Sequence, residues 1–312
     1  MKSQVQIPFF LVTGFLGSGK TTLLRRFLVM HAKSRRIGVI QNEFAAGNVD
    51  GRELRETGEP FELLEVNKGS VFCVCLLSDF QKSLAAFYDR IMPDAVILEA
   101  TGLADPIALG QMLQAPALRT RFYLAHVWCI VDAGTFSRFD AGLPRLRHQI
   151  RIADSIVINK TDKASASIEA IQRRVRELNP FARIYTASYC DVDLTRAFEP
   201  LSSEPVALHR AEEHSAIEPG GRPPVQSKMI RTTRSISKTA LETFLASAAS
   251  SLFRLKGYVN LDDETAVAVQ CCFGETCLVE IDDYTGPSEL VLIGPESAEI
   301  STEVRRLLAG ER

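Results

Sequence analysis

The chain has few cysteines and no long hydrophobic run, and both features narrow its class. Its seven cysteines are an odd number at irregular spacings, which argues against the disulfide framework of a small secreted protein. No uninterrupted apolar stretch approaches the roughly 20 residues that a membrane-spanning helix needs. We therefore expect a protein of the reducing cytoplasm that does not associate with membranes.

The sequence also lacks an excess of either charge. Its 36 Lys and Arg residues against 38 Asp and Glu residues give a formal net charge of −2 at pH 7. Without a basic surplus, we expect no nucleic-acid partner. Hydrophobic residues make up 46% of the 312 residues and charged residues 24%, which is typical of a soluble globular protein.

Short apolar runs alternate with amphipathic stretches from residue 7 to about residue 190. Runs such as IPFFLVTG, DAVILEAT and DSIVINK are apolar almost throughout, as in strands that are covered on both faces of a parallel sheet. Intervening stretches such as ASIEAIQRRVRELN have helical spacing. This alternation predicts an α/β fold with a doubly wound, mostly parallel sheet that binds ligands at the carboxyl ends of its strands.

The remainder of the chain predicts a separate small domain. Residues 201–226 are rich in Pro, Gly, Ser and charge, so we expect a linker between a domain at 1–200 and an α+β domain at 227–312. In the second domain we expect a helix that Ser237 could cap and Gly257 could end. Three strands, in TAVAVQCCF, TCLVEID and ELVLIG, and a last helix in SAEISTEVRRLLAG should follow.

The segment GFLGSGKTT carries the P-loop pattern, in which two glycines with four residues between them precede Lys and Thr. The glycines let backbone N–H groups wrap around phosphate oxygens, and the following helix adds its positive end. We expect Lys20 to contact the outer phosphates and Thr21 to bind Mg²⁺. The residues that we assign to this part of a nucleotide site are Gly14, Gly17, Ser18, Gly19, Lys20, Thr21 and Thr22.

A second element, VILEATGLADP, places an acid and a glycine after an apolar strand. Glu99 ends the strand, where its carboxylate could hold Mg²⁺ through water. The backbone N–H of Gly102 could contact the γ-phosphate and report its hydrolysis. We expect both residues, together with Lys20 and Thr21, to act in catalysis.

A third element, VINKTD, indicates which base is bound. The Asp162 carboxylate could accept two hydrogen bonds from the N1–H and the exocyclic amine of guanine, a donor pair that adenine does not offer. Asn159 could hold the loop and the base edge, and the Lys160 stem could lie over the purine. These residues predict GTP and GDP as ligands rather than ATP. YTASY, residues 185–189, falls where a loop supporting the base is expected.

With these motifs, the chain resembles the CobW-like (cobalamin-synthesis-type) P-loop GTPases. The matching segments are GFLGSGKTTLL, NEF followed by VDG, EATGLADP, NKTD and, near the carboxyl end, RLKGYV. The resemblance covers nearly the whole chain. It implies a P-loop NTPase domain with a small CobW-like C-terminal domain, and slow, Mg²⁺-dependent GTP hydrolysis coupled to delivery of a transition metal or metal-containing cofactor. The implied partner is a client metalloprotein or cofactor-dependent protein, and a homodimer is compatible with it.

The sequence departs from the family where the metal is bound. The family has Gly-Cys-x-Cys-Cys, and the aligned residues 69–73 read GSVFC, with a further cysteine at position 75. The first and last acids of the family's ENEFGE segment are replaced, by Gln41 and Ala46. A Zn²⁺ or Co²⁺ site needs three or four thiolate, imidazole or carboxylate ligands, and Cys73 and Cys75 supply two. In an extended segment these two would share a face.

Two interpretations of Cys73 and Cys75 remain open, a metal site and small apolar residues of a core. A redox pair is disfavoured because two residues usually separate its cysteines. Three roles for the nucleotide cycle follow: a metallochaperone, a GTP-gated chaperone of a cofactor enzyme that binds no metal itself, and a kinase-like enzyme, which NKTD disfavours. No residue stands out as the group that positions the attacking water, and Glu43 and Asp50 are the candidates.

Overall fold

The computed structural model divides into two compact units, Met1–Pro200 and Leu201–Arg312, and each is described by itself. The structure describes residues 6–42, 54–55, 57–66, 74–102, 106–137, 144–164, 167–179, 181–198, 225–248, 252–272, 275–281, 284, 286–295 and 302. The predicted last helix lies outside these residues, apart from Thr302.

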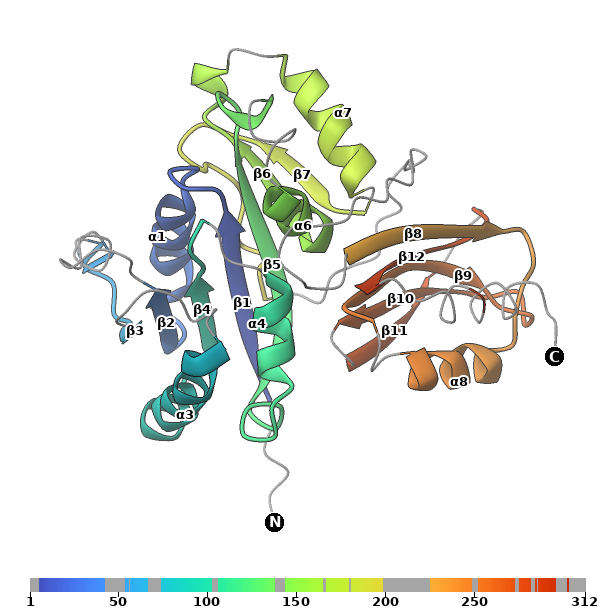
Figure 1. Cartoon of the computed structure of the whole chain (residues 1–312), viewed down its shortest axis with the longest axis horizontal. Coiled ribbons are helices and arrows are strands. Elements are labelled where there is room, and N and C mark those ends of the chain that lie inside the picture. Colours follow the sequence, from blue (N-terminus) through green and yellow to red (C-terminus); the bar gives the residue numbers. More distant parts are fainter. Residues whose placement is uncertain are drawn as a thin grey trace. The chain divides into compact units, whose positions relative to one another are not determined.

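The first unit is built on a seven-stranded sheet in the order β3-β2-β4-β1-β5-β6-β7 (Figure 1). Each of the six strand pairings is parallel, as the apolar runs predict. The strands are β1 (Ile7–Gly14), β2 (Ile37–Asn42), β3 (Glu62–Val66), β4 (Ala95–Glu99), β5 (Phe122–Asp132), β6 (Ser155–Asn159) and β7 (Arg183–Thr186).

Helices connect these strands and cover both faces of the sheet. They are α1 (Lys20–His31), α3 (Val74–Ile91), α4 (Pro106–Leu113), α6 (Pro144–Ile152), the short 3-10 helix η1 (Thr161–Lys163) and α7 (Ile168–Leu178). Leu24 and Phe27 of α1 pack with Val39 and Ile97 on one face. On the other face α6 and α7 pack against residues of β5 and β6. The predicted doubly wound α/β fold is therefore confirmed.

The second unit is a five-stranded antiparallel sheet in the order β11-β10-β9-β12-β8, with one described helix. Leu241, Phe244 and Leu245 of that helix join the core of this unit. The elements are β8 (Val225–Thr232), α8 (Lys238–Ala248), β9 (Arg254–Asn260), β10 (Ala266–Cys272), β11 (Glu275–Ile281) and β12 (Ser288–Pro295).

The predicted helix of this unit begins as expected but ends early. The Ser237 hydroxyl accepts a hydrogen bond from the Ala240 backbone N–H at 3.2 Å and so caps α8. The helix ends at Ala248, and Gly257 lies instead within β9, opposite Leu290 of β12. Leu255, Gly257 and Val259 alternate along one face of β9 with Arg254, Lys256 and Tyr258 on the other, a strand period that the helix prediction overlooked. The strand β8, which begins at Val225, was not predicted.

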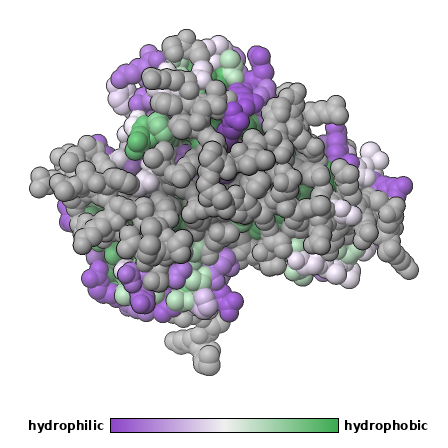
Figure 2. All heavy atoms as spheres, in the orientation of Figure 1, coloured by the Kyte–Doolittle hydropathy of each residue, from purple (hydrophilic) through white to green (hydrophobic). Residues whose placement is uncertain are grey.

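On the face shown in Figure 2, the described surface is mostly hydrophilic with smaller hydrophobic areas between. Within the described ranges, no helix combines the length and the apolar character that crossing a membrane requires.

Candidate nucleotide-binding site

The P-loop joins the end of β1 to the start of α1, at the carboxyl edge of the sheet. Gly19 is the residue before α1 and has a φ of 113°, in the left-handed region that favours glycine. A Cβ at this position would lie 2.4 Å from the Asn159 side-chain nitrogen, so a larger residue would displace that side chain. The Ser18 side chain is fully buried inside the loop, at 0% exposure.

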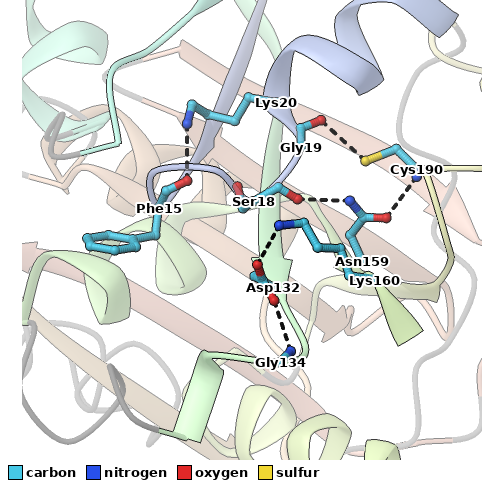
Figure 3. A network of polar contacts seen from close by, with 9 residues as sticks. All are labelled: Phe15, Ser18, Gly19, Lys20, Asp132, Gly134, Asn159, Lys160 and Cys190. Carbon is cyan, nitrogen blue, oxygen red and sulfur yellow. Dashed lines mark hydrogen bonds and ion pairs between the residues drawn. The ribbon is translucent and has the colours of Figure 1, made fainter. Parts of the chain in front are cut away.

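Lys20 begins α1 with its side chain 7% exposed. Its ammonium group donates a hydrogen bond to the Phe15 carbonyl oxygen at 3.1 Å, across the loop (Figure 3). The charge therefore lies among the backbone groups of the P-loop, where an anionic phosphate would be attracted.

Thr21 and Glu99 bring two oxygen donors together at the start of α1. The Thr21 hydroxyl donates to a Glu99 carboxylate oxygen at 2.9 Å. A hydroxyl and a carboxylate side by side are the ligands that Mg²⁺ prefers, directly or through water, so these residues fit that ion. Gly102 approaches the P-loop as well, because a Cβ there would lie 2.5 Å from the Leu16 backbone nitrogen.

Asn159 connects the P-loop to the loop after β7. Its side-chain N–H₂ donates to the Ser18 carbonyl oxygen at 2.8 Å, and its side-chain oxygen accepts from the Cys190 backbone N–H at 2.8 Å. The Cys190 thiol in turn donates to the Gly19 carbonyl oxygen at 3.3 Å (Figure 3). The Leu23 N–H of α1 donates to that same carbonyl at 3.0 Å.

These contacts orient two successive peptide groups of the P-loop. In a planar trans peptide, the C=O and the N–H point in opposite directions. Because the Ser18 and Gly19 carbonyls face Asn159 and Cys190, the N–H groups of Gly19 and Lys20 face the opposite way. Successive N–H groups that converge in this manner form an anion-binding concavity. The loop after β7, which contains Cys190, therefore helps to shape the concavity that would bind phosphate.

The Lys160 side chain is held by an acid that sequence reasoning missed. Its ammonium group forms an ion pair with Asp132, at the end of β5, at 2.7 Å, and the other Asp132 oxygen accepts from the Gly134 N–H at 2.9 Å. Lys160 itself has a left-handed φ of 60°. The position of Asp132 at the end of a neighbouring parallel strand is the signal that could have identified it.

Asp162 is exposed and is oriented by Ser188. The Ser188 hydroxyl donates to one Asp162 carboxylate oxygen at 2.8 Å and lies 3.0 Å from the Thr161 hydroxyl. The YTASY segment was expected to support the base, and Ser188 is the residue within it that contacts the predicted base-reading acid. An Asp162 carboxylate fixed in this way can accept hydrogen bonds from a base in one preferred direction.

Arg26 fixes the same loop from α1. Its guanidinium donates to the Tyr189 carbonyl oxygen at 2.8 Å and pairs with Asp191 at 2.6 Å. A cavity of about 460 Å³ lies beside these residues, within the 300–1,000 Å³ range of ligand pockets. Because Thr22 and Tyr189 both line it, the cavity extends from the end of the P-loop to the loop that carries Ser188.

Two buried thiols are poor candidates for a transition metal. Cys190 and Cys129 are both fully buried, and burial raises the pKa of each thiol to about 12. A thiol must lose its proton to bind a metal, so the raised pKa disfavours both residues as ligands near neutral pH. Protonation also lets Cys190 donate its hydrogen bond to Gly19.

The structure changes the interpretation of the predicted metal motif. Cys75 is the second residue of α3, so the extended segment in which it would share a face with Cys73 is wrong at this position. Phe80, Leu84 and Phe87 are buried at helical spacing along α3, which favours a helix over an extended segment. Cys73, Glu43, Ala46 and Asp50 lie outside the described residues. In the part of the chain that is described, no group of three or more His, Cys, Asp and Glu residues could hold a metal.

The chain matches two family models. Residues 8–186 match the CobW/HypB/UreG nucleotide-binding domain, and residues 225–310 match the cobalamin synthesis protein cobW C-terminal domain. The zinc chaperone YjiA of Escherichia coli is 27% identical over 326 aligned residues, which cover 98% of this chain and 99% of that protein. The zinc chaperone CobW of a Sinorhizobium species is 32% identical over 201 residues, 55% of this chain and 56% of that one.

A solved structure agrees with this assignment. The crystal structure of the Zn(II)-bound YjiA GTPase from E. coli has a TM-score of 0.63 and 25% identity, with 99% of each chain covered. The chain therefore belongs to the CobW/HypB/UreG family of P-loop GTPases.

Proposed function

We propose that this protein binds GTP and hydrolyses it slowly with Mg²⁺, and that the cycle drives delivery of a transition metal to a client protein in the cytoplasm. The network around Asn159 carries the nucleotide part of the proposal. It joins Ser18 of the P-loop to Cys190, in the loop that also orients Asp162 through Ser188. Phosphate-binding and base-reading residues thus belong to one hydrogen-bonded unit.

In the proposed reaction a water molecule attacks the γ-phosphate of GTP. Lys20 and the N–H groups of Gly19 and Lys20 stabilise negative charge on the phosphate oxygens, and the Gly102 N–H contacts the γ-phosphate. Bound Mg²⁺ would neutralise charge on the β- and γ-phosphates, and Thr21 and Glu99 are the residues that would hold it. Asn159, Lys160 and Asp162 select guanine. Gly14, Gly17 and Thr22 belong to the P-loop that binds the phosphates.

We propose Zn²⁺ as the metal that is delivered, since the relatives YjiA and CobW carry the name zinc chaperone. Delivery of Co²⁺ or of a corrinoid is a weaker proposal, because only the name of the family supports it. A second candidate is a GTP-gated chaperone that binds no metal itself. It is favoured by Gln41, a neutral amide where the family has a carboxylate, and by residues 69–73, which retain one cysteine of the family motif. We also propose that the protein contacts a client protein and that it associates into a homodimer.

Metal binding by the full-length protein separates the two candidates. The protein is purified under reducing conditions, and Zn²⁺ affinity is measured by competition with a chromophoric chelator in the presence of GTP or GDP. Zinc delivery predicts binding that changes with the nucleotide and weakens in the Cys73→Ser/Cys75→Ser variant. If wild type binds GTP but competes for no Zn²⁺ in either state, the protein is not a zinc carrier and the second candidate holds.

Replacement of Cys190 by alanine is expected to weaken GDP binding about fivefold, because one hydrogen bond to the P-loop is lost at a net cost of about 1 kcal/mol. Cys190→Ser keeps a hydroxyl donor and should restore most of the affinity. Isothermal titration calorimetry measures both variants. Cys129→Ala is the matched control, since it removes a fully buried thiol from β5 in the same unit. If Cys190→Ala and wild type bind GDP equally well, the hydrogen bond from Cys190 to the P-loop does not support nucleotide binding.

A further inference from the structure

Gln41 is a buried amide that has no hydrogen-bond partner among the described residues. The residue is 5% exposed, and both its side-chain nitrogen and its side-chain oxygen are buried and unpaired in the described part of the protein. Leaving a buried donor and acceptor unpaired costs free energy, and native proteins contain few such groups. Water or a polar atom that arrives with a ligand would satisfy both groups.

The position of Gln41 indicates what that ligand is. Gln41 lies near the carboxyl end of β2, directly opposite Glu99 of the neighbouring strand β4. Adjacent strands are about 4.8 Å apart, and residues in register on parallel strands point to the same side. Ile37 and Val39, four and two residues before Gln41, pack with α1, so the Gln41 side chain points to the α1 face. Glu99 on that face accepts the hydrogen bond from Thr21.

Gln41 therefore adjoins the proposed Mg²⁺ and γ-phosphate site on the side away from β1, because β4 separates β2 from β1 in the sheet (Figure 1). An amide is suited to water, since it offers one acceptor and two donors and carries no charge. A second carboxylate at this position would stand beside Glu99, and like charges so close oppose one another's ionisation. The neutral amide avoids that repulsion.

We propose that Gln41 is a catalytic residue that orients the attacking water, an inference that rests on the proposed GTPase function. The amide oxygen accepts a hydrogen bond from the water, and the amide N–H₂ donates to a γ-phosphate oxygen. The water oxygen forms a bond to the γ-phosphorus, and the bond from phosphorus to the β,γ-bridging oxygen breaks with its electron pair left on GDP. The water gives up its proton to a phosphate oxygen and then to solvent, so Gln41 neither gains nor loses a proton.

The test is Gln41→Met, which keeps the length of the side chain and removes its hydrogen bonds. Single-turnover hydrolysis of GTP at saturating Mg²⁺ should slow about a hundredfold, as in other enzymes that lose one positioned polar group. GDP affinity should stay within about twofold of wild type, because GDP has no γ-phosphate for the amide to contact, and GTP affinity should fall no more than about fivefold, the cost of one hydrogen bond. The thermal midpoint of the nucleotide-free variant should equal or exceed that of wild type, since an unpaired buried amide is gone.

The combination of slower hydrolysis with undiminished stability separates catalysis from a structural role. Gln172→Met, on α7, is the matched control and should leave all three quantities unchanged. The proposal is overturned if Gln41→Met hydrolyses GTP at the wild-type rate, or if GDP affinity and thermal midpoint fall together with the rate. A wild-type protein that hydrolyses no GTP contradicts the proposed function itself, which is a separate outcome.

Discussion

Replacement of Asp162 by asparagine is expected to exchange the base preference of this protein from guanine to xanthine. In the proposed site the carboxylate would accept hydrogen bonds from the guanine N1–H and exocyclic amine, and an asparagine N–H₂ would meet that amine donor to donor. Xanthine has a carbonyl oxygen where guanine has the amine, so the asparagine N–H₂ finds an acceptor there. Hydrogen bonds to charged groups contribute about 1.5–3 kcal/mol each. Losing the bond to the exocyclic amine, which then faces another donor, and weakening the bond to N1–H, which then meets a neutral oxygen, lowers GTP affinity about a hundredfold.

Competition binding with GTP, XTP and ATP measures this exchange. Ser188, which donates to Asp162 at 2.8 Å, can also donate to the asparagine oxygen, so the loop should keep its conformation. Asp263→Asn is the control, because Asp263 is an exposed acid of the second unit that accepts from Thr265. If Asp162→Asn binds GTP as tightly as wild type, Asp162 does not read the base and the assignment of NKTD is wrong.

Replacement of Thr21 by valine should nearly abolish Mg²⁺-dependent hydrolysis, with a loss of about a thousandfold in rate. Valine has the shape of threonine but lacks the oxygen, so the proposed Mg²⁺ ligand and the 2.9 Å hydrogen bond to Glu99 are both removed. Nucleotide binding in the absence of Mg²⁺ should change little, since Lys20 and the P-loop backbone remain.

Rates at increasing Mg²⁺ concentration distinguish loss of the ion from loss of the fold. The Thr21→Val variant should show no rise in rate where wild type saturates. Thr243→Val, which removes a hydroxyl that hydrogen-bonds within α8, serves as control for the substitution itself. A Thr21→Val variant with the Mg²⁺ dependence of wild type would show that the ion is held elsewhere.

The local motifs were predictable because each depends on residues close together in sequence. Glycine spacing before Lys20 predicts a loop that wraps phosphate, and continuous apolar runs predict a covered parallel sheet. Once the strand order is known, Glu99 and Asn159 both fall at one edge of that sheet. The alternation of strands and helices therefore carried most of the information about the fold.

The contacts that complete the site were not predictable, because they join distant parts of the chain. Cys190 lies 171 residues from Gly19, and its thiol contact depends on the path of the loop after β7. Asp132 ends an apolar strand and belongs to none of the sequence motifs. Its ion pair with Lys160 depends on β5 and β6 being neighbours in the sheet. Gln41 looked like a lost carboxylate in the sequence, and its burial beside Glu99 gave it a different interpretation.

The errors in prediction have equally local causes. Residues 254–257 continue an apolar pattern that fits a helix or a strand, and packing of Leu255 and Val259 against the helix α8 selected the strand. Cys75 was treated as part of an extended segment, although α3 begins at Val74. In both cases the hydrophobic period alone did not locate where one element ends and the next begins.

Equilibrium binding of GTP and ATP to the full-length wild-type protein, by calorimetry with and without Mg²⁺, tests the central claim most directly. Since Asp162 and the Asn159 network form one site with the P-loop, GTP should bind at least about a hundredfold more tightly than ATP. Mg²⁺ should strengthen GTP binding further. Equal affinity for the two nucleotides, or tighter binding of ATP, would contradict the account.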